Sequence, residues 1–167
     1  SMPTDKQFES ESGCKEALTG IYLKGGTQTW YAVDLTVAYL DELAGLYSDY
    51  PGYNTNAVFD QSIVFDYENM FLSKKNGIYS TMYNIIANIN NFLEYVDKNK
   101  DVLVTERYYE TMKGEALGLR AFLHFDLLRM FGPVYKEHPA SKAIPYRTTF
   151  DKDATPVLPA SEVVDAI

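Results

Sequence analysis

The side chains best suited to acid–base or nucleophilic chemistry are few, and their spacing does not favour catalysis. His124 and Asp126 are two positions apart on a predicted helix, so they point to different faces, and no Ser or Cys is near them in the sequence to act as a nucleophile. A catalytic triad therefore has almost no support. We interpret Arg120, His124, Asp126 and Arg129 as structural residues, and the i,i+3 spacing predicts an ion pair between Asp126 and Arg129.

Carboxylates are the next candidates, because a glycoside hydrolase needs two of them facing a sugar. Asp34, Asp41 and Glu42 fall near one another on another predicted helix. Their more ordinary role is to solvate the outer face of that helix, and we favour this role. A glycoside hydrolase is kept as the less favoured alternative.

Two stretches imitate the ligand spacing of a calcium loop without completing it. Asp97 to Asp101 supplies alternating oxygen ligands, but the position that needs Gly is Val102 and the position that needs Glu is Tyr108. Asp151 to Glu162 repeats the spacing with Pro156 at the glycine position. One Cys and two His cannot form a multi-cysteine zinc or iron–sulfur site. We therefore expect no metal and no cofactor.

An aromatic loop at residues 48–56 is the group of side chains most suited to binding. Flat tyrosine rings offer stacking area for a sugar, while Asn and Asp carry donors and acceptors that match vicinal hydroxyls. A tryptophan follows a flexible glycine-rich segment and is expected near the surface. The candidate ligand-binding residues are Trp30, Asp41, Tyr47, Tyr50, Tyr53, Asn54 and Asn56. The alternative, an aromatic turn packed on its own scaffold, stays open.

The composition of the chain limits its size class and its partners. Its 167 residues suit one ordinary domain. A net charge of -8 disfavours nucleic acid and anionic membrane as partners. No apolar run approaches the length that crosses a bilayer. The 14 tyrosines and 9 phenylalanines suit a half-wet binding surface as well as a helical core.

The elements that must position these residues are predicted to be helices. Apolar residues at helical spacing predict four of them, at about Ser10 to Leu23, Ala32 to Tyr47, Ile78 to Val96, and from after Thr105 to Phe131. Thr105 is the expected N-cap of the last helix, and Gly132-Pro133 ends it. The two long helices are joined by a short polar turn, so they are predicted to pack antiparallel.

The two long helices are expected to bury one apolar face each. The predicted face of the first is Ile78, Met82, Ile85, Ile86, Ile89, Leu93 and Val96. The predicted face of the second is Leu117, Ala121, Leu128 and Phe131, widened by Phe122 and Phe125. Ser62 to Phe65 could form a short strand, so at most a minor β element is expected. Residues 133–160, rich in proline, are predicted to form an extended strap before a helix that Ser161 caps.

Three segments together resemble one protein family. They are the helix Ile78 to Val96, the run Gly114 to Pro133, which reads GEALGLRAFLHFDLLRMFGP, and Ile144-Pro145-Tyr146 before Ser161-Glu162-Val163. In this order and spacing they resemble the N-terminal part of the SusD/RagB outer-membrane lipoproteins of Bacteroidetes. The resemblance is most specific from Tyr79 to Ile167.

The resemblance implies an all-α fold of antiparallel, tetratricopeptide-like helix pairs with long irregular loops. It implies that residues 1–167 are the N-terminal domain of a longer chain, with an extension at 1–9, a helical core at 10–132, the strap at 133–160 and a further helix starting at 161–167. It also implies a non-enzymatic, surface-exposed lipoprotein of the outer membrane, whose lipid anchor is absent from this chain. Such a protein binds an oligosaccharide and delivers it to a SusC-type TonB-dependent transporter. A helical protein–protein scaffold is the other alternative.

Overall fold

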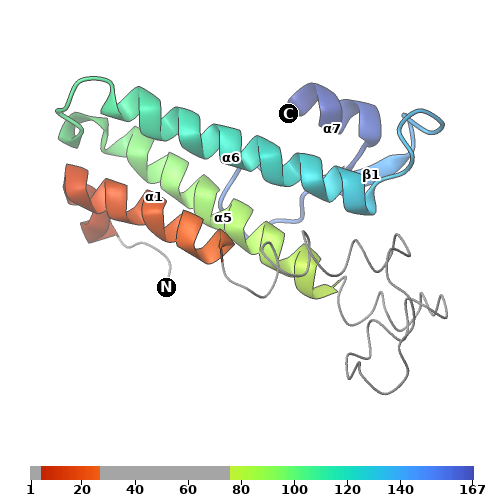
Figure 1. Ribbon diagram of the computed structural model, residues 1–167, viewed down its shortest axis with the longest axis horizontal. Coiled ribbons are helices and arrows are strands. Elements are labelled where there is room, and N and C mark those ends of the chain that lie inside the picture. Colours follow the sequence, from red (N-terminus) through yellow and green to blue (C-terminus); the bar gives the residue numbers. More distant parts are fainter. Residues whose placement is uncertain (1–4, 27–75) are drawn as a thin grey trace, which may run out of the picture. The chain divides into compact units, whose positions relative to one another are not determined.

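The computed structural model describes residues 5–26 and 76–167 (Figure 1). The chain divides into two compact units, one made of residues 1–21 and 82–167 and the other of residues 22–81. Helix α1 (Glu11–Gly25) has its last residues in the second unit, and α5 (Asn76–Lys98) has its first residues there.

The described elements are mainly helical, as the sequence predicts. In chain order they are the 3-10 helix η1 (Asp5–Glu9), α1, α5, the 3-10 helix η4 (Lys100–Val102), α6 (Tyr108–Phe131), strands β1 (Lys142–Pro145) and β2 (Val157–Pro159), and α7 (Ala160–Ala166). The minor β element is an antiparallel pair inside the strap, with a register shift between Lys142 and Ile144. The helix predicted at 32–47 and the strand predicted at 62–65 lie outside the described residues. Within the described ranges, no helix has the length and apolarity needed to cross a membrane.

The apolar face of α5 supplies the centre of the core. Ile86, Ile89 and Val96 are fully buried, as is Phe92 beside them. All seven positions predicted to face the core from this helix are buried. Their i,i+3 and i,i+4 spacing keeps them on one side of the helix, and each large side chain buried there contributes about 1.5–3 kcal/mol.

The predicted buried face of α6 is largely wrong. The helix lies antiparallel to α5 (Figure 1) but buries Met112, Ala116, Leu123, His124, Leu127 and Leu128. Leu117, Phe122 and Phe125 are 38%, 46% and 44% exposed. Apolar residues occur almost all round this helix, so the sequence offers more than one apolar stripe and periodicity alone does not choose between them. The buried face observed in the structure is rotated about the helix axis relative to the predicted one, and it includes a buried polar residue, His124.

The 3-10 helix η1 packs on the end of α5, and the start of α1 binds the turn between α5 and α6. Phe8 is fully buried, with its ring centroid 5.9 Å from that of Phe92 and 5.0 Å from that of Tyr95. Glu11 accepts two hydrogen bonds from Thr105, one from the backbone N–H at 2.9 Å and one from the hydroxyl at 2.7 Å. Thr105 is therefore not the N-cap of α6, because its side chain binds Glu11 instead. The residue at the N-cap is Arg107, in the left-handed conformation with φ 65°.

The strap contains the two paired strands and leads into α7. Lys142 pairs with Pro159 and Pro145 with Val157 across the two strands. The helix begins at Ala160, one residue before the predicted cap, and no side-chain cap bond is made there. Ala160 and Val163 are fully buried, so α7 is held by packing.

Candidate functional site

Four side chains from α5 and α6 bind the backbone of the strap, and we call Tyr83, Asn90, Arg120 and His124 the strap clamp. The Tyr83 hydroxyl donates to the carbonyl oxygen of Pro145 at 2.7 Å. The backbone N–H of Arg147 donates to His124 Nε2 at 3.0 Å. The residues that follow β1 have no neighbouring strand, so their backbone groups need such partners where they are buried.

Asn90 is the centre of the clamp. Its Nδ2 donates to the carbonyl oxygens of Arg147 and Thr149, both at 3.2 Å, and its Oδ1 accepts from Arg120 Nη1 at 2.9 Å. Arg120 Nη1 also lies 3.5 Å from the carbonyl oxygen of Thr148. Asn90 is only 3% exposed, and the hydrogen bonds at both ends of its amide offset the free-energy cost of burying it.

His124 is fully buried and neutral, with both ring nitrogens in use. Because Nε2 accepts the N–H of Arg147, the proton is on Nδ1, which donates to the carbonyl oxygen of Arg120 at 2.9 Å. Burial is the main cause that lowers the pKa of His124 to about 4; the hydrogen bond to the Arg120 backbone opposes this shift, and the nearby Arg120 charge adds to it. The ring also packs 4.2 Å from the ring of Tyr146, measured between centroids. His124 therefore positions the strap and is not arranged as an acid or base.

Arg120 carries an unpaired donor within the clamp. Its Nε is buried and has no acceptor among the described residues. A buried donor without a partner costs about 1–3 kcal/mol, so the remaining bonds of the guanidinium must offset this cost. Arg120 and His124 contact the strap, and Arg129 Nη1 lies 3.5 Å from Asp126 Oδ1, which confirms the predicted i,i+3 pair.

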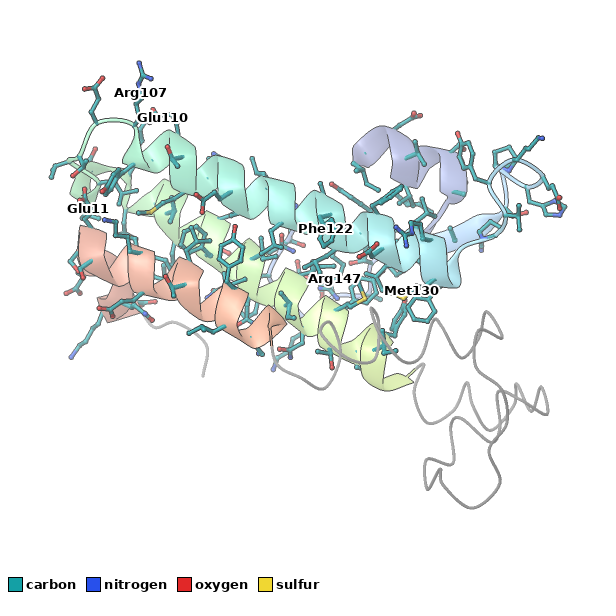
Figure 2. All side chains as sticks on the ribbon, viewed as in Figure 1. Glu11, Arg107, Glu110, Phe122, Met130 and Arg147 are labelled. Atoms are coloured by element: carbon teal, nitrogen blue, oxygen red, sulfur yellow. The ribbon has the colours of Figure 1, made fainter. Side chains whose placement is uncertain are left out.

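Beside the clamp lies a groove of about 520 Å³ between α5, α6 and the strap. Its lining residues are Asn90, Leu93, Glu94, Asp97, Lys113, Leu117, Arg120, Thr148, Thr149, Phe150 and Asp151. Figure 2 labels Arg147, the strap residue just before this lining, and Phe122 on α6. The groove belongs entirely to the unit of residues 1–21 and 82–167.

Each carboxylate of the groove is held in an ion pair. Lys113 Nζ binds both oxygens of Asp97, at 2.8 and 2.9 Å, and the hydroxyl of Tyr109 donates to the same carboxylate. Hydrogen bonds from Lys113 lower the pKa of Asp97 below its usual range. Glu94 pairs with Lys98, and Asp151 pairs with Arg147 at 3.2 Å. A hydrogen bond with the side chain of Thr149 is the main cause that lowers the pKa of the Asp151 carboxyl group.

The calcium-like spacing at 97–101 does not form a loop of converging ligands. Asp97 is still on α5 and binds Lys113, while Lys100 to Val102 form the short helix η4. Asp151 binds the backbone N–H of Asp153 and pairs with Arg147. Among residues 5–26 and 76–167 there is no cluster of three or more His, Cys, Asp or Glu that could hold a metal ion.

The seven residues predicted to bind ligand all lie outside the described residues. They are Trp30, Asp41, Tyr47, Tyr50, Tyr53, Asn54 and Asn56. Asp34 and Glu42 lie there too, so their role as solvating carboxylates stays a prediction. The sequence patterns do not predict the clamp residues Tyr83 and Asn90, nor the groove. One sequence signal was present: Asn88, Asn90 and Asn91 fall within the most apolar helix, where a buried amide requires a specific partner.

A family model for SusD-like proteins, described as "Starch-binding associating with outer membrane", matches residues 1–162. No curated protein and no solved structure matches the chain. The match covers α1, α5, α6, the strap and the first turn of α7, and so includes α5, α6 and the strap, which build the clamp and the groove.

Proposed function

Because the chain belongs to the SusD-like family of starch-binding, outer-membrane-associated proteins, we propose that it captures an oligosaccharide at the cell surface and delivers it to a SusC-type TonB-dependent transporter. The family match over residues 1–162 is the observation that carries this proposal. The proposed attachment to the membrane is a lipid anchor. The proposed ligand is a glycan of the starch type or a related oligosaccharide.

We propose that the activity is binding and not hydrolysis. The family description names binding and association, and no reaction. The one buried histidine is already committed to two backbone groups, and the carboxylates of the groove are ion-paired. An inverting or retaining glycosidase needs one carboxyl group that can give a proton, whereas the lowered pKa values of Asp97 and Asp151 favour their charged forms.

The proposed ligand surface is the aromatic loop at 48–56 with Trp30, Asp41 and Tyr47. Its rings and amides suit the apolar faces and hydroxyls of a sugar.

A binding panel tests the proposal. The intact chain is titrated by calorimetry with malto-, xylo- and manno-oligosaccharides and with oligogalacturonide, and each mixture is then analysed for cleavage products. Binding of at least one oligosaccharide without products is expected. Reproducible cleavage that disappears on Asp41→Ala or Glu42→Ala would establish the hydrolase instead. Absence of binding, together with recovery of a protein partner from co-expressed outer-membrane proteins, would favour the scaffold.

A further inference from the structure

The groove between α5, α6 and the strap has walls that are fixed before any ligand arrives. The strap clamp holds the backbone of Pro145, Arg147 and Thr149 through Tyr83, His124 and Asn90. Thr148, Thr149 and Phe150 line the groove from this held segment. A site whose walls are already ordered loses little entropy on binding, so its contacts contribute more fully to affinity.

The size and shape of the groove suit a small molecule or a short chain segment. Its volume of about 520 Å³ lies within the range of roughly 300–1,000 Å³ that is usual for small-molecule sites. Its lining residues come from the two long helices and one extended segment.

The lining combines exposed apolar surface with closely spaced polar groups. Phe150 is 37% exposed and Leu117 is 38% exposed, so both present apolar surface to solvent. Around them are carboxylates, an ammonium and the hydroxyls of Thr148 and Thr149. A sugar ring has an apolar face bordered by hydroxyls that both donate and accept, and this combination of groups complements it.

The charges of the groove indicate a neutral ligand. Glu94, Asp97 and Asp151 are each paired with a lysine or an arginine, namely Lys98, Lys113 and Arg147. The Arg120 guanidinium is engaged by an amide oxygen and a carbonyl oxygen. Such a lining of paired charges offers many hydrogen-bonding atoms and no strong field of one sign, so it does not select an anion.

We propose that this groove is a saccharide subsite, separate in sequence from the aromatic loop at 48–56, and that it binds a short neutral segment of a glycan chain. The inference rests on the proposed glycan-binding function and adds a location and a substrate class to it. Phe150 provides the apolar platform, and the groups that bind the hydroxyls are Glu94, Asp97, Lys113 and Thr149.

Variants at one aromatic residue test the subsite. The wild-type chain and Phe150→Ala are titrated with the neutral oligosaccharide that binds best in the panel and with oligogalacturonide. Loss of one stacking contact predicts an affinity about three- to tenfold weaker for Phe150→Ala. Phe150→Trp, which keeps an aromatic ring at this position, should bind the oligosaccharide with about wild-type affinity. Tyr135→Ala is the matched control, because Tyr135 is an aromatic side chain 49% exposed outside the groove. Thermal unfolding of each variant checks that it is folded.

A second measurement locates the ligand directly and does not depend on the variants. In amide NMR spectra of the wild-type chain, the neutral oligosaccharide should shift the backbone signals of Thr148, Thr149 and Phe150. If wild type binds the glycan but these signals do not move and Phe150→Ala binds equally well, the subsite is wrong and the proposed function stands. If oligogalacturonide binds more tightly than every neutral oligosaccharide, the neutral class is wrong. If no oligosaccharide binds, both proposals fail together.

Discussion

His124 and Arg147, far apart in the sequence, are joined by a bond from the backbone N–H of Arg147 to the imidazole Nε2 at 3.0 Å. The bond requires a neutral ring, because a protonated imidazole has no acceptor. It ties the strap to the C-terminal half of α6, and it makes the attachment of the strap sensitive to acid.

Acid should therefore destabilise the fold in a defined pH window. The pKa of His124 is about 4 in the folded chain against 6.5 for the unperturbed side chain. Between these values the unfolded chain binds a proton that the folded chain does not, so the free energy of unfolding falls as the pH falls from about 6.5 to about 4. The total loss is about 3 kcal/mol, at about 1.4 kcal/mol per pKa unit. Urea unfolding at a series of pH values measures it.

The two histidines provide a matched comparison for this window. His124→Gln should be less stable than wild type at pH 7 and should show a shallower pH dependence between pH 6.5 and 5. His138→Gln changes a side chain that is 63% exposed and should behave as wild type. An unchanged slope in His124→Gln would show that other groups cause the acid sensitivity.

Asn90→Ala should loosen the strap more than it disturbs the helices. The substitution removes two donated bonds and the acceptor of Arg120 from a buried position, and it takes the Asn90 donor away from the carbonyl oxygens of Arg147 and Thr149. We expect a loss of about 2–3 kcal/mol in the free energy of unfolding. Asn99→Ala, which removes one bond from the residue just after α5 to the carbonyl oxygen of Tyr95, is the control and should cost less than about 1 kcal/mol.

Hydrogen exchange shows where the Asn90 effect acts. The amide of Arg147 should exchange faster in Asn90→Ala than in wild type, while amides in the middle of α5 keep their protection. Equal acceleration along α5 and the strap would mean that the whole unit opens together and that the clamp does not act locally.

How far the sequence predicts this structure depends on how each element is patterned. The single apolar stripe of α5 from Met82 to Val96 predicts both the helix and its buried face. In α6 the helix is predictable but its face is not, because Leu117 and Phe122 compete with Leu123 and Leu127 as core residues. The choice is made by tertiary contacts, above all by the bonds of His124 and Arg120 to a strap that follows later in the chain.

The groove was not predictable for a related reason. Its lining joins α5, α6 and residues 148–151, which are brought together only by the clamp. Proline spacing predicts that the strap is extended, yet it does not predict where the strap lies. An asparagine within an apolar helix, as at position 90, is the signal that a backbone partner must come from elsewhere.

Two glycines of α1 should respond to alanine in opposite directions. A Cβ at Gly13 would lie 1.8 Å from the carbonyl oxygen of Gln7, so Gly13→Ala must displace the backbone that joins η1 to α1. We expect a loss of about 1–3 kcal/mol. A Cβ at Gly20 meets nothing within 4 Å, so Gly20→Ala should raise stability by about 0.5–1 kcal/mol through helix propensity. Thermal unfolding of both variants checks the pair, and equal effects would contradict it.

Tyr50→Ala and Tyr53→Ala test the aromatic loop as the main ligand surface. Lost stacking predicts an oligosaccharide affinity weaker by about 1 kcal/mol or more, while the free energy of unfolding changes by less than about 1 kcal/mol if these rings contact ligand and not the core. Calorimetric titration and urea unfolding of the same samples measure both quantities.

Comparing these variants with Phe150→Ala distinguishes the two proposed surfaces. If one glycan segment spans both, each variant should weaken binding and the double variant Tyr50→Ala with Phe150→Ala should lose about the sum of the two effects, because independent contacts add. If only the Phe150 variant weakens binding, the loop at 48–56 is scaffold and the groove is the principal site. If Tyr50→Ala or Tyr53→Ala unfolds the chain, the loop packs on its own scaffold, which is the alternative that its composition leaves open.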